Sequence, residues 1–118
     1  MSKLPDEVLK KILNEIQTQA ITSQQHITTS QIQRQAKEKE KKISELIYEE
    51  LSKLTKDTPV YSSAGKAFIK EDLNQIEQKL ATQIKEINNE IDSLNKKIIY
   101  HETTLANTQP HIERIMKS

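Results

Sequence analysis

Apolar residues in the C-terminal part of the chain recur at alternating intervals of four and three positions. The series has eleven positions, nine of them Ile or Leu: Leu80, Ile84, Ile87, Ile91, Leu94, Ile98, His101, Leu105, Thr108, Ile112 and Ile115. This alternation is the seam of a left-handed coiled coil. Asp72, followed three residues later by Gln75, forms a capping box, so the pattern predicts a helix over 72–117.

Pro110 lies inside this predicted helix. A proline has no N–H to donate to the carbonyl four residues earlier, here Ala106, and its ring crowds that carbonyl. We therefore expect the helix to be interrupted there, by a kink or an end, with Thr108 capping a short final segment.

The first half of the chain carries a weaker form of the same pattern. Pro5 suits a first helical turn, and Asp6 and Glu7 favour its positive dipole end. One register holds Leu9, Leu13, Ile16, Ala20 and Ile27; after a phase slip around residues 28–30 it resumes at Ile32, Ala36, Ile43, Ile47, Leu51 and Leu54. Because Thr58 precedes Pro59 and is pushed to extended geometry, the helix is expected over 5–56.

The segment 57–71 differs abruptly in composition. It contains the only Gly of the chain, Gly65, between two short runs rich in β-favouring residues. We predict a β-hairpin in which Gly65 adopts a positive φ. Because this connection is short, the two flanking helices are expected to run antiparallel. Residues that face each other then have numbers that sum to about 127, and the two chain ends lie together. The expected fold is mainly α: one domain over 1–118, a long antiparallel two-helix coiled coil joined by a β-hairpin.

The composition excludes several classes of function. The chain has 118 residues, 30% charged and 34% hydrophobic, with a net charge of +1 and no Cys. A disulfide scaffold and a thiolate site are thereby excluded, and no basic arm indicates nucleic-acid binding. His26, His101 and His111 lack the spacing of metal ligands on one helix, and no nucleophile–base pair is discernible. We expect no enzyme, no metal, no cofactor and no membrane span, and a cytoplasmic protein.

The hairpin predicts association with other chains. Isolated two-stranded hairpins are barely stable in water, and both of their edges leave backbone groups unpaired. We expect neighbouring polypeptides to supply the missing strands. The residues predicted to form this subunit interface are Val60, Tyr61, Gly65, Phe68 and Ile69.

The opposite end of the coil is the second candidate site. Apolar residues converge there from both ends of the chain. They form either the last layers of the coil's core or, because they spread beyond a single stripe, a usable surface for the exposed apolar groups of another protein. The predicted members of this tip are Leu4, Val8, Leu9, Ile12, Leu13, Ile16, Ile112, Ile115 and Met116.

Two motifs resemble the β-type subunits of prefoldin: the hairpin sequence at 60–69 and the second-helix motif formed by Lys97 and residues 100–105. The resemblance implies a heterohexamer of α-type and β-type subunits whose hairpins form a double β-barrel platform. It also implies an ATP-independent chaperone that grips non-native proteins, such as actin and tubulin, at its coiled-coil tips and passes them to the cytosolic chaperonin. The alternative is a structural coiled-coil scaffold or tether without client binding.

Overall fold

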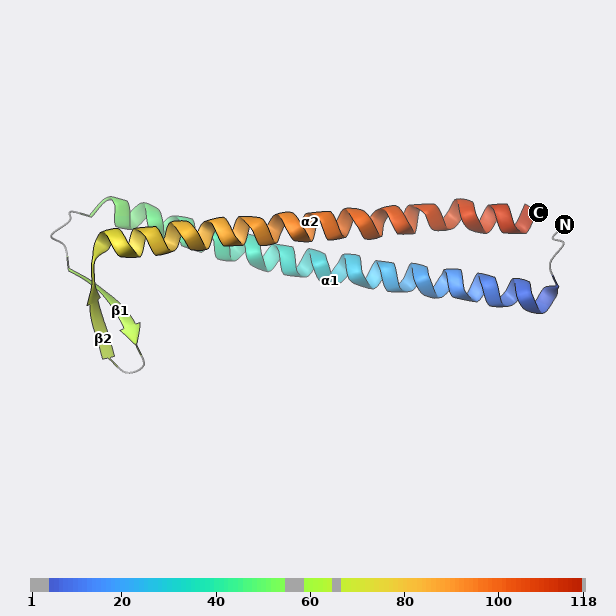
Figure 1. The fold of residues 1–118 in the computed structure, drawn as a ribbon, viewed down its shortest axis with the longest axis horizontal. Coiled ribbons are helices and arrows are strands. Elements are labelled where there is room, and N and C mark those ends of the chain that lie inside the picture. The colour runs from blue at the N-terminus through green and yellow to red at the C-terminus, as the bar shows by residue number, and fades with distance from the viewer. Residues whose placement is uncertain (1–4, 55–58, 65–66, 118) are drawn as a thin grey trace. The chain divides into compact units, whose positions relative to one another are not determined.

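The computed structural model describes residues 5–54, 59–64 and 67–117, with the backbone alone described over 62–64, over 67–71 and at 117. The elements follow in the order α1 (Asp6–Ser52), β1 (Val60–Ala64), β2 (Ala67–Glu71) and α2 (Leu73–Lys117) (Figure 1). The expectation of two long helices is confirmed. The chain divides into two compact units, Met1–Arg34 with Ser93–Ser118, and Gln35–Asp92.

Local hydrogen bonds determine where the helices begin and end. The Asp72 carboxylate accepts the Asn74 N–H at 3.3 Å and so caps the start of α2. Helix α1 ends at Ser52, four residues earlier than the predicted 56. The next two amides, of Lys53 and Leu54, bond carbonyls three residues back rather than four, a tightened turn that leaves the α-helical path.

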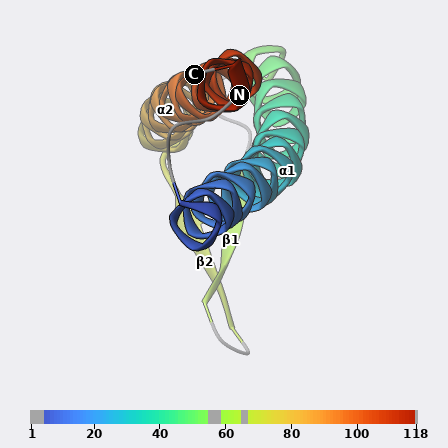
Figure 2. The same ribbon diagram turned by 90° about the vertical axis from the view of Figure 1, so that its right-hand side faces the viewer.

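The helices pair in the predicted antiparallel register within each unit. In the first unit the rings of His26 and His101 stack, with centroids 4.5 Å apart. In the second unit Lys37 Nζ lies 2.6 Å from Glu90 Oε2. The residue numbers of both pairs sum to 127, and Figures 1 and 2 show α1 and α2 running alongside each other.

The seam of α2 is as predicted. All eleven positions of the series from Leu80 to Ile115 are buried or half-buried, and Ile87 and Ile98 are the most deeply buried of them at 3% exposed. The expected interruption at Pro110 is wrong. Helix α2 continues through Pro110 to Lys117, and the Thr108 hydroxyl donates to the Thr104 carbonyl inside the helix instead of capping a new segment.

The predicted phase slip in α1 is also wrong. Ile32 and Ile43, assigned to the resumed seam, are 62% and 59% exposed, Ile47 and Leu54 are exposed as well, and so is Ala36; of the resumed series only Leu51 is half-buried. Steps of four and three instead continue unbroken from Leu9 to Ser44. The buried and half-buried positions of this continued seam beyond Ile27 are Ser30, Arg34, Lys37, Lys41 and Ser44.

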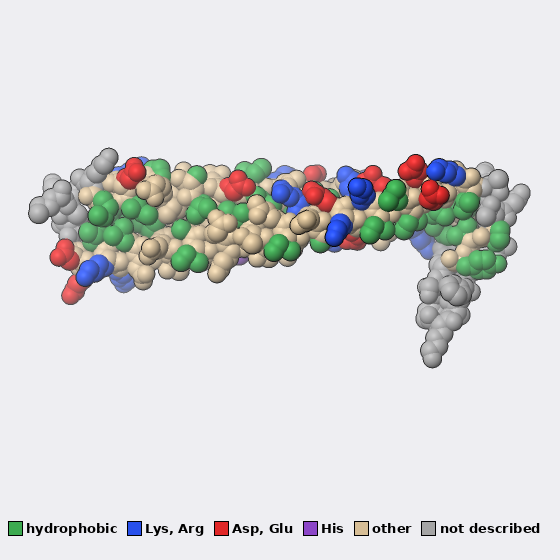
Figure 3. Space-filling model, turned by 180° about the vertical axis from the view of Figure 1, so that it is seen from behind, with side chains coloured by type: hydrophobic (Ala, Val, Ile, Leu, Met, Phe, Trp, Pro, Cys, Tyr) green, Lys and Arg blue, Asp and Glu red, His purple; other side chains and the backbone are tan. Residues whose placement is uncertain are grey.

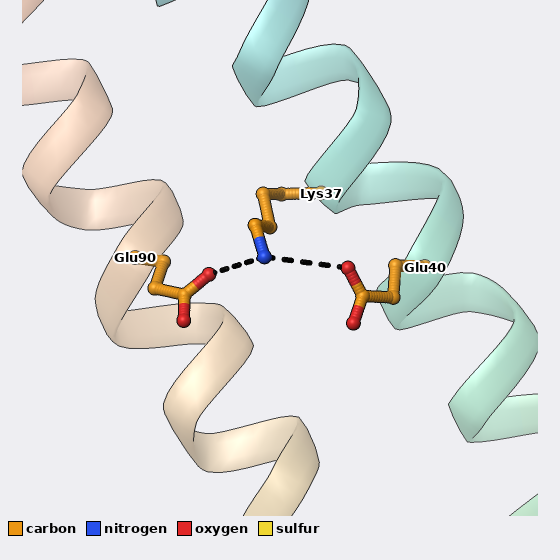
Figure 4. A network of polar contacts seen from close by, with 3 residues as sticks. All are labelled: Lys37, Glu40 and Glu90. Carbon is orange, nitrogen blue, oxygen red and sulfur yellow. Dashed lines mark hydrogen bonds and ion pairs between the residues drawn. The ribbon is translucent and has the colours of Figure 1, made fainter.

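This polar stretch of α1 is compatible with packing because its long side chains are amphipathic. Arg and Lys can lay their methylene stems along apolar surface while their charged heads reach polar partners. Arg34 Nη1 donates to Asn95 Oδ1 at 2.8 Å in the first unit. In the second unit Lys37 lies between Glu90 and Glu40 (Figure 4), and the hydrogen bond to Glu90 raises the pKa of Lys37 against the opposing effect of desolvation.

The strands form a two-stranded antiparallel sheet in the second unit. Val60 pairs with Glu71 at one end and Ala64 with Ala67 at the other. Gly65, predicted to take the turn conformation, lies outside the described residues. The hairpin lies between the two helices in the chain, where the sequence predicts it (Figure 1).

Ser30 provides a test of the polar seam. Its side chain is 1% exposed and its Oγ has no hydrogen-bond partner, which costs about 1–3 kcal/mol for a buried hydroxyl. We expect Ser30→Ala to raise the free energy of unfolding by about 1 kcal/mol more than Ser93→Ala does. Ser93 is exposed on α2, so it reports the gain in helix propensity alone. If denaturant unfolding shows an equal gain in the free energy of unfolding for both variants, the cost assigned to the buried Ser30 hydroxyl is wrong.

The histidine stack predicts a pH dependence of stability. Desolvation, and then the charges of His26 and Lys97, lower the pKa of His101. The folded state therefore binds fewer protons than the unfolded state, so stability is complete above the unfolded pKa of about 6.5 and is lost as pH falls below it. Between pH 7.5 and pH 5.5 we expect Tm to fall more in the wild type than in His101→Leu. His111→Gln, which changes an exposed histidine, should keep the wild-type slope.

Candidate functional site

The predicted tip lies in the first unit, where the first turns of α1 and the last turns of α2 lie at the same end (Figure 1). Ile16 is buried at 7% exposed, whereas Val8 and Met116 are 43% and 52% exposed. Leu4 lies outside the described residues. The half-buried members of the predicted tip are Leu9, Ile12, Leu13, Ile112 and Ile115.

The tip is apolar but incompletely closed. Farther along the same unit, Ile27 and Ile98 are 5% and 3% exposed, so two helices can close a core layer there. From Ile16 toward the chain ends no described apolar residue is buried to that degree. Figure 3 shows apolar side chains gathered between the helices at this end. The arrangement offers apolar surface to another molecule while the coil remains formed.

A groove of about 410 Å³ adjoins the tip in the same unit. Ile16 of α1 and Pro110 of α2 contribute its apolar surface, and polar side chains from both helices make up most of the rest. The polar lining residues are Gln19, Thr104, Asn107, Thr108, His111 and Arg114. The apolar pattern within each helix gave no reason to select these residues as a site. The antiparallel register of the two helices could have brought them together, because it sets Ile16 opposite His111 and Gln19 opposite Thr108.

The predicted subunit interface lies at the hairpin in the second unit. Tyr61 is 58% exposed and Val60 is half-buried. Together with Leu54 and Pro59 they line an open, mainly apolar hollow. Phe68 and Ile69 lie in β2, paired with Ser63 and Ser62 respectively; Gly65 is outside the described residues. An exposed aromatic residue within a two-stranded sheet, as Tyr61 is in β1, is typical of a surface that another chain covers.

The described residues contain no group of three or more His, Asp or Glu side chains placed to hold a metal ion. The structure nevertheless joins His26 to His101, a contact that spacing within one helix could not reveal. The two-helix register was the signal that could have found it. Neither described helix has an apolar stretch long enough to cross a membrane.

Comparisons with known proteins identify the family. Residues 14–118 match the family model described as Prefoldin subunit. The chain belongs to the prefoldin subunit family. This assignment accounts for a fold in which two long helices flank a short pair of strands.

Relatives within the family agree with a more specific resemblance to prefoldin subunit 1, carried by residues 60–69, Lys97 and residues 100–105. The chain is 38% identical over 110 residues to the "Probable prefoldin subunit 1" of Schizosaccharomyces pombe, covering 93% of this chain and 98% of the relative. It is 27% identical to the human "Prefoldin subunit 1", covering 94% and 91%.

A solved structure matches the fold. The prefoldin beta subunit from Thermococcus strain KS-1 superposes with a TM-score of 0.81 at 17% identity, covering 100% of this chain and 99% of that one. At this identity the match supports the fold: two long helices with the strands between them.

Proposed function

We propose that the chain is a subunit of a cytoplasmic, ATP-independent chaperone of the prefoldin type, a heterohexamer of α-type and β-type subunits. It captures unfolded proteins, such as actin and tubulin, at its coiled-coil tip and transfers them to the cytosolic chaperonin. Membership of the prefoldin subunit family supports the chaperone class. The observation that carries client capture is the half-open apolar tip of the first unit.

Each tip binds weakly on its own. Val8 and Met116 expose about half of their surfaces, and their neighbours are half-buried, so the apolar area available to a client is small. Several tips held on one platform convert later contacts with the same unfolded chain into intramolecular ones, which raises the avidity without nucleotide hydrolysis. An assembly therefore holds clients that a single coil releases.

The hairpin supplies the platform in this proposal. Tyr61 is exposed, the hollow beside it is apolar, and a two-stranded sheet has two outer edges. Strands from neighbouring subunits that add to those edges would pair backbone groups and cover Tyr61, completing an intersubunit barrel. Assembly and client capture thus use residues that are far apart in the sequence, and separate variants can test each one.

The tip variant tests client capture. Replacing Val8 and Met116 with Ser removes apolar surface that the coil does not bury, and costs about 1 kcal/mol of client binding per tip, roughly fivefold in affinity. We expect the variant to assemble normally but to require a higher molar ratio to suppress aggregation of unfolded actin.

The matched control is Ile32→Ser with Ile99→Ser. These side chains are 62% and 63% exposed in the same unit but lie outside the predicted tip. This control should suppress aggregation like the wild type. A scaffold without client binding predicts no suppression by any of these proteins, and an equal loss in both double variants would assign client capture to general surface apolarity.

Tyr61 tests the platform. A carboxylate at an interface that loses its water is destabilising, so we expect Tyr61→Asp to prevent hexamer formation with partner subunits, as seen by native mass spectrometry. Tyr100→Asp makes the same change at a residue that is 68% exposed on α2 and should leave the hexamer mass unchanged. An intact hexamer with Tyr61→Asp would remove this residue from the interface.

A further inference from the structure

We propose that the groove beside the tip binds an extended peptide segment in which an aliphatic residue is followed by an acidic one. This inference rests on the proposed function and deepens it, because it names the class of client segment that the tip selects. The groove is the one formed by Ile16 and Gln19 of α1 with Asn107, Pro110, His111 and Arg114 among its α2 residues.

The apolar part of the groove accommodates one aliphatic side chain. Ile16 is 7% exposed, so its side chain forms the floor between the helices, and the Pro110 ring adds apolar surface from α2. The volume of about 410 Å³ suits a short stretch of peptide rather than a folded element. An aliphatic side chain placed there loses water from its surface, which favours binding.

The amide side chains favour an extended backbone. Gln19 on α1 and Asn107 on α2 both line the groove, and each amide carries a carbonyl acceptor and an NH₂ donor. In a folded helix or sheet the backbone N–H and C=O groups are already paired, whereas an unfolded segment has them free.

The charge of the groove selects the neighbouring residue. Arg114 and His111 line one part of it, and no Asp or Glu is among its lining residues. The Arg guanidinium donates two parallel hydrogen bonds to a carboxylate, a geometry that lysine and neutral groups do not reproduce. A client segment with Asp or Glu next to its aliphatic residue therefore gains an interaction that a neutral segment lacks.

The test uses the ¹⁵N-labelled full-length chain and two synthetic octapeptides with blocked ends. One contains Leu-Asp and the other Leu-Asn, each in a Gly-Ser background. We expect both peptides to shift the side-chain NH₂ signals of Gln19 and Asn107, and the Leu-Asp peptide to bind about two- to fivefold more tightly, the range for a solvent-accessible ion pair. Arg114→Gln should remove this preference without weakening the Leu-Asn peptide.

Lys10→Gln is the matched control, because it removes one positive charge from α1 in the same unit at a residue that does not line the groove. It should keep the preference for Leu-Asp. An equal loss in Lys10→Gln and Arg114→Gln, or shifts confined to residues outside the groove, would overturn the inference.

A second measurement separates this inference from the proposed function. If Val8→Ser with Met116→Ser weakens suppression of actin aggregation while the peptides leave the groove signals unchanged, client capture stands and the groove is not its site. If the tip variant suppresses like the wild type and the peptides still bind with the expected preference, the groove binds peptides independently of that function. Failure of both measurements overturns both.

Discussion

A ladder of six Ile and Leu residues at the seam positions of α2, from Leu80 to Ile98, holds the two helices together, because the sequence has no longer Ile and Leu run at this alternating spacing. Ile87 and Ile98 are almost fully buried on it, and each fully buried side chain of this kind contributes about 1.5–3 kcal/mol. Helix α1 has no comparable series of Ile and Leu. The geometry of the helix, rather than residue type, therefore determines which of its residues face α2. Whatever residue falls at the facing position must pack there, including Arg34 and Lys37.

The same constraint explains why the tip in the first unit and the hairpin in the second suit the proposed roles. A seam formed by only two helices closes its best layers, such as the one that contains Ile27, but leaves the layers nearest the chain ends half-open. At the other end of α2 the connection to α1 passes through a sheet of two described strands. In the proposed function, other molecules cover the apolar surface at each of these two places.

The fold was largely predictable from the sequence, whereas the seam of α1 was not. On α2 the apolar pattern and the helical period agree, so every predicted seam position is buried or half-buried. On α1 they disagree. Ile21, Ile32, Ile43 and Leu54 are spaced by eleven residues and all are exposed. The last three of them suggested a phase slip that the continuous helix does not make.

The groove and the histidine pair escaped prediction for a related reason. Both depend on residues that become neighbours only when one helix is set against the other, such as Gln19 with Asn107 or His26 with His101. Patterns within one helix carry no information on such pairs. The continuity of α2 at Pro110 shows the converse, because neighbouring turns can keep a helix intact where the local rule predicts a break.

The polar seam also makes the coil respond to dissolved ions in two opposite ways. Lys37 and Glu90 keep 35% and 50% of their side-chain surface in contact with solvent, so electrolyte screens their attraction. The buried ladder of α2 has no charge to screen, and excluded salts such as sulfate strengthen apolar burial. A rise in ionic strength therefore redistributes stability along the coil, weakening the stretch around Lys37 relative to the layers around Ile98.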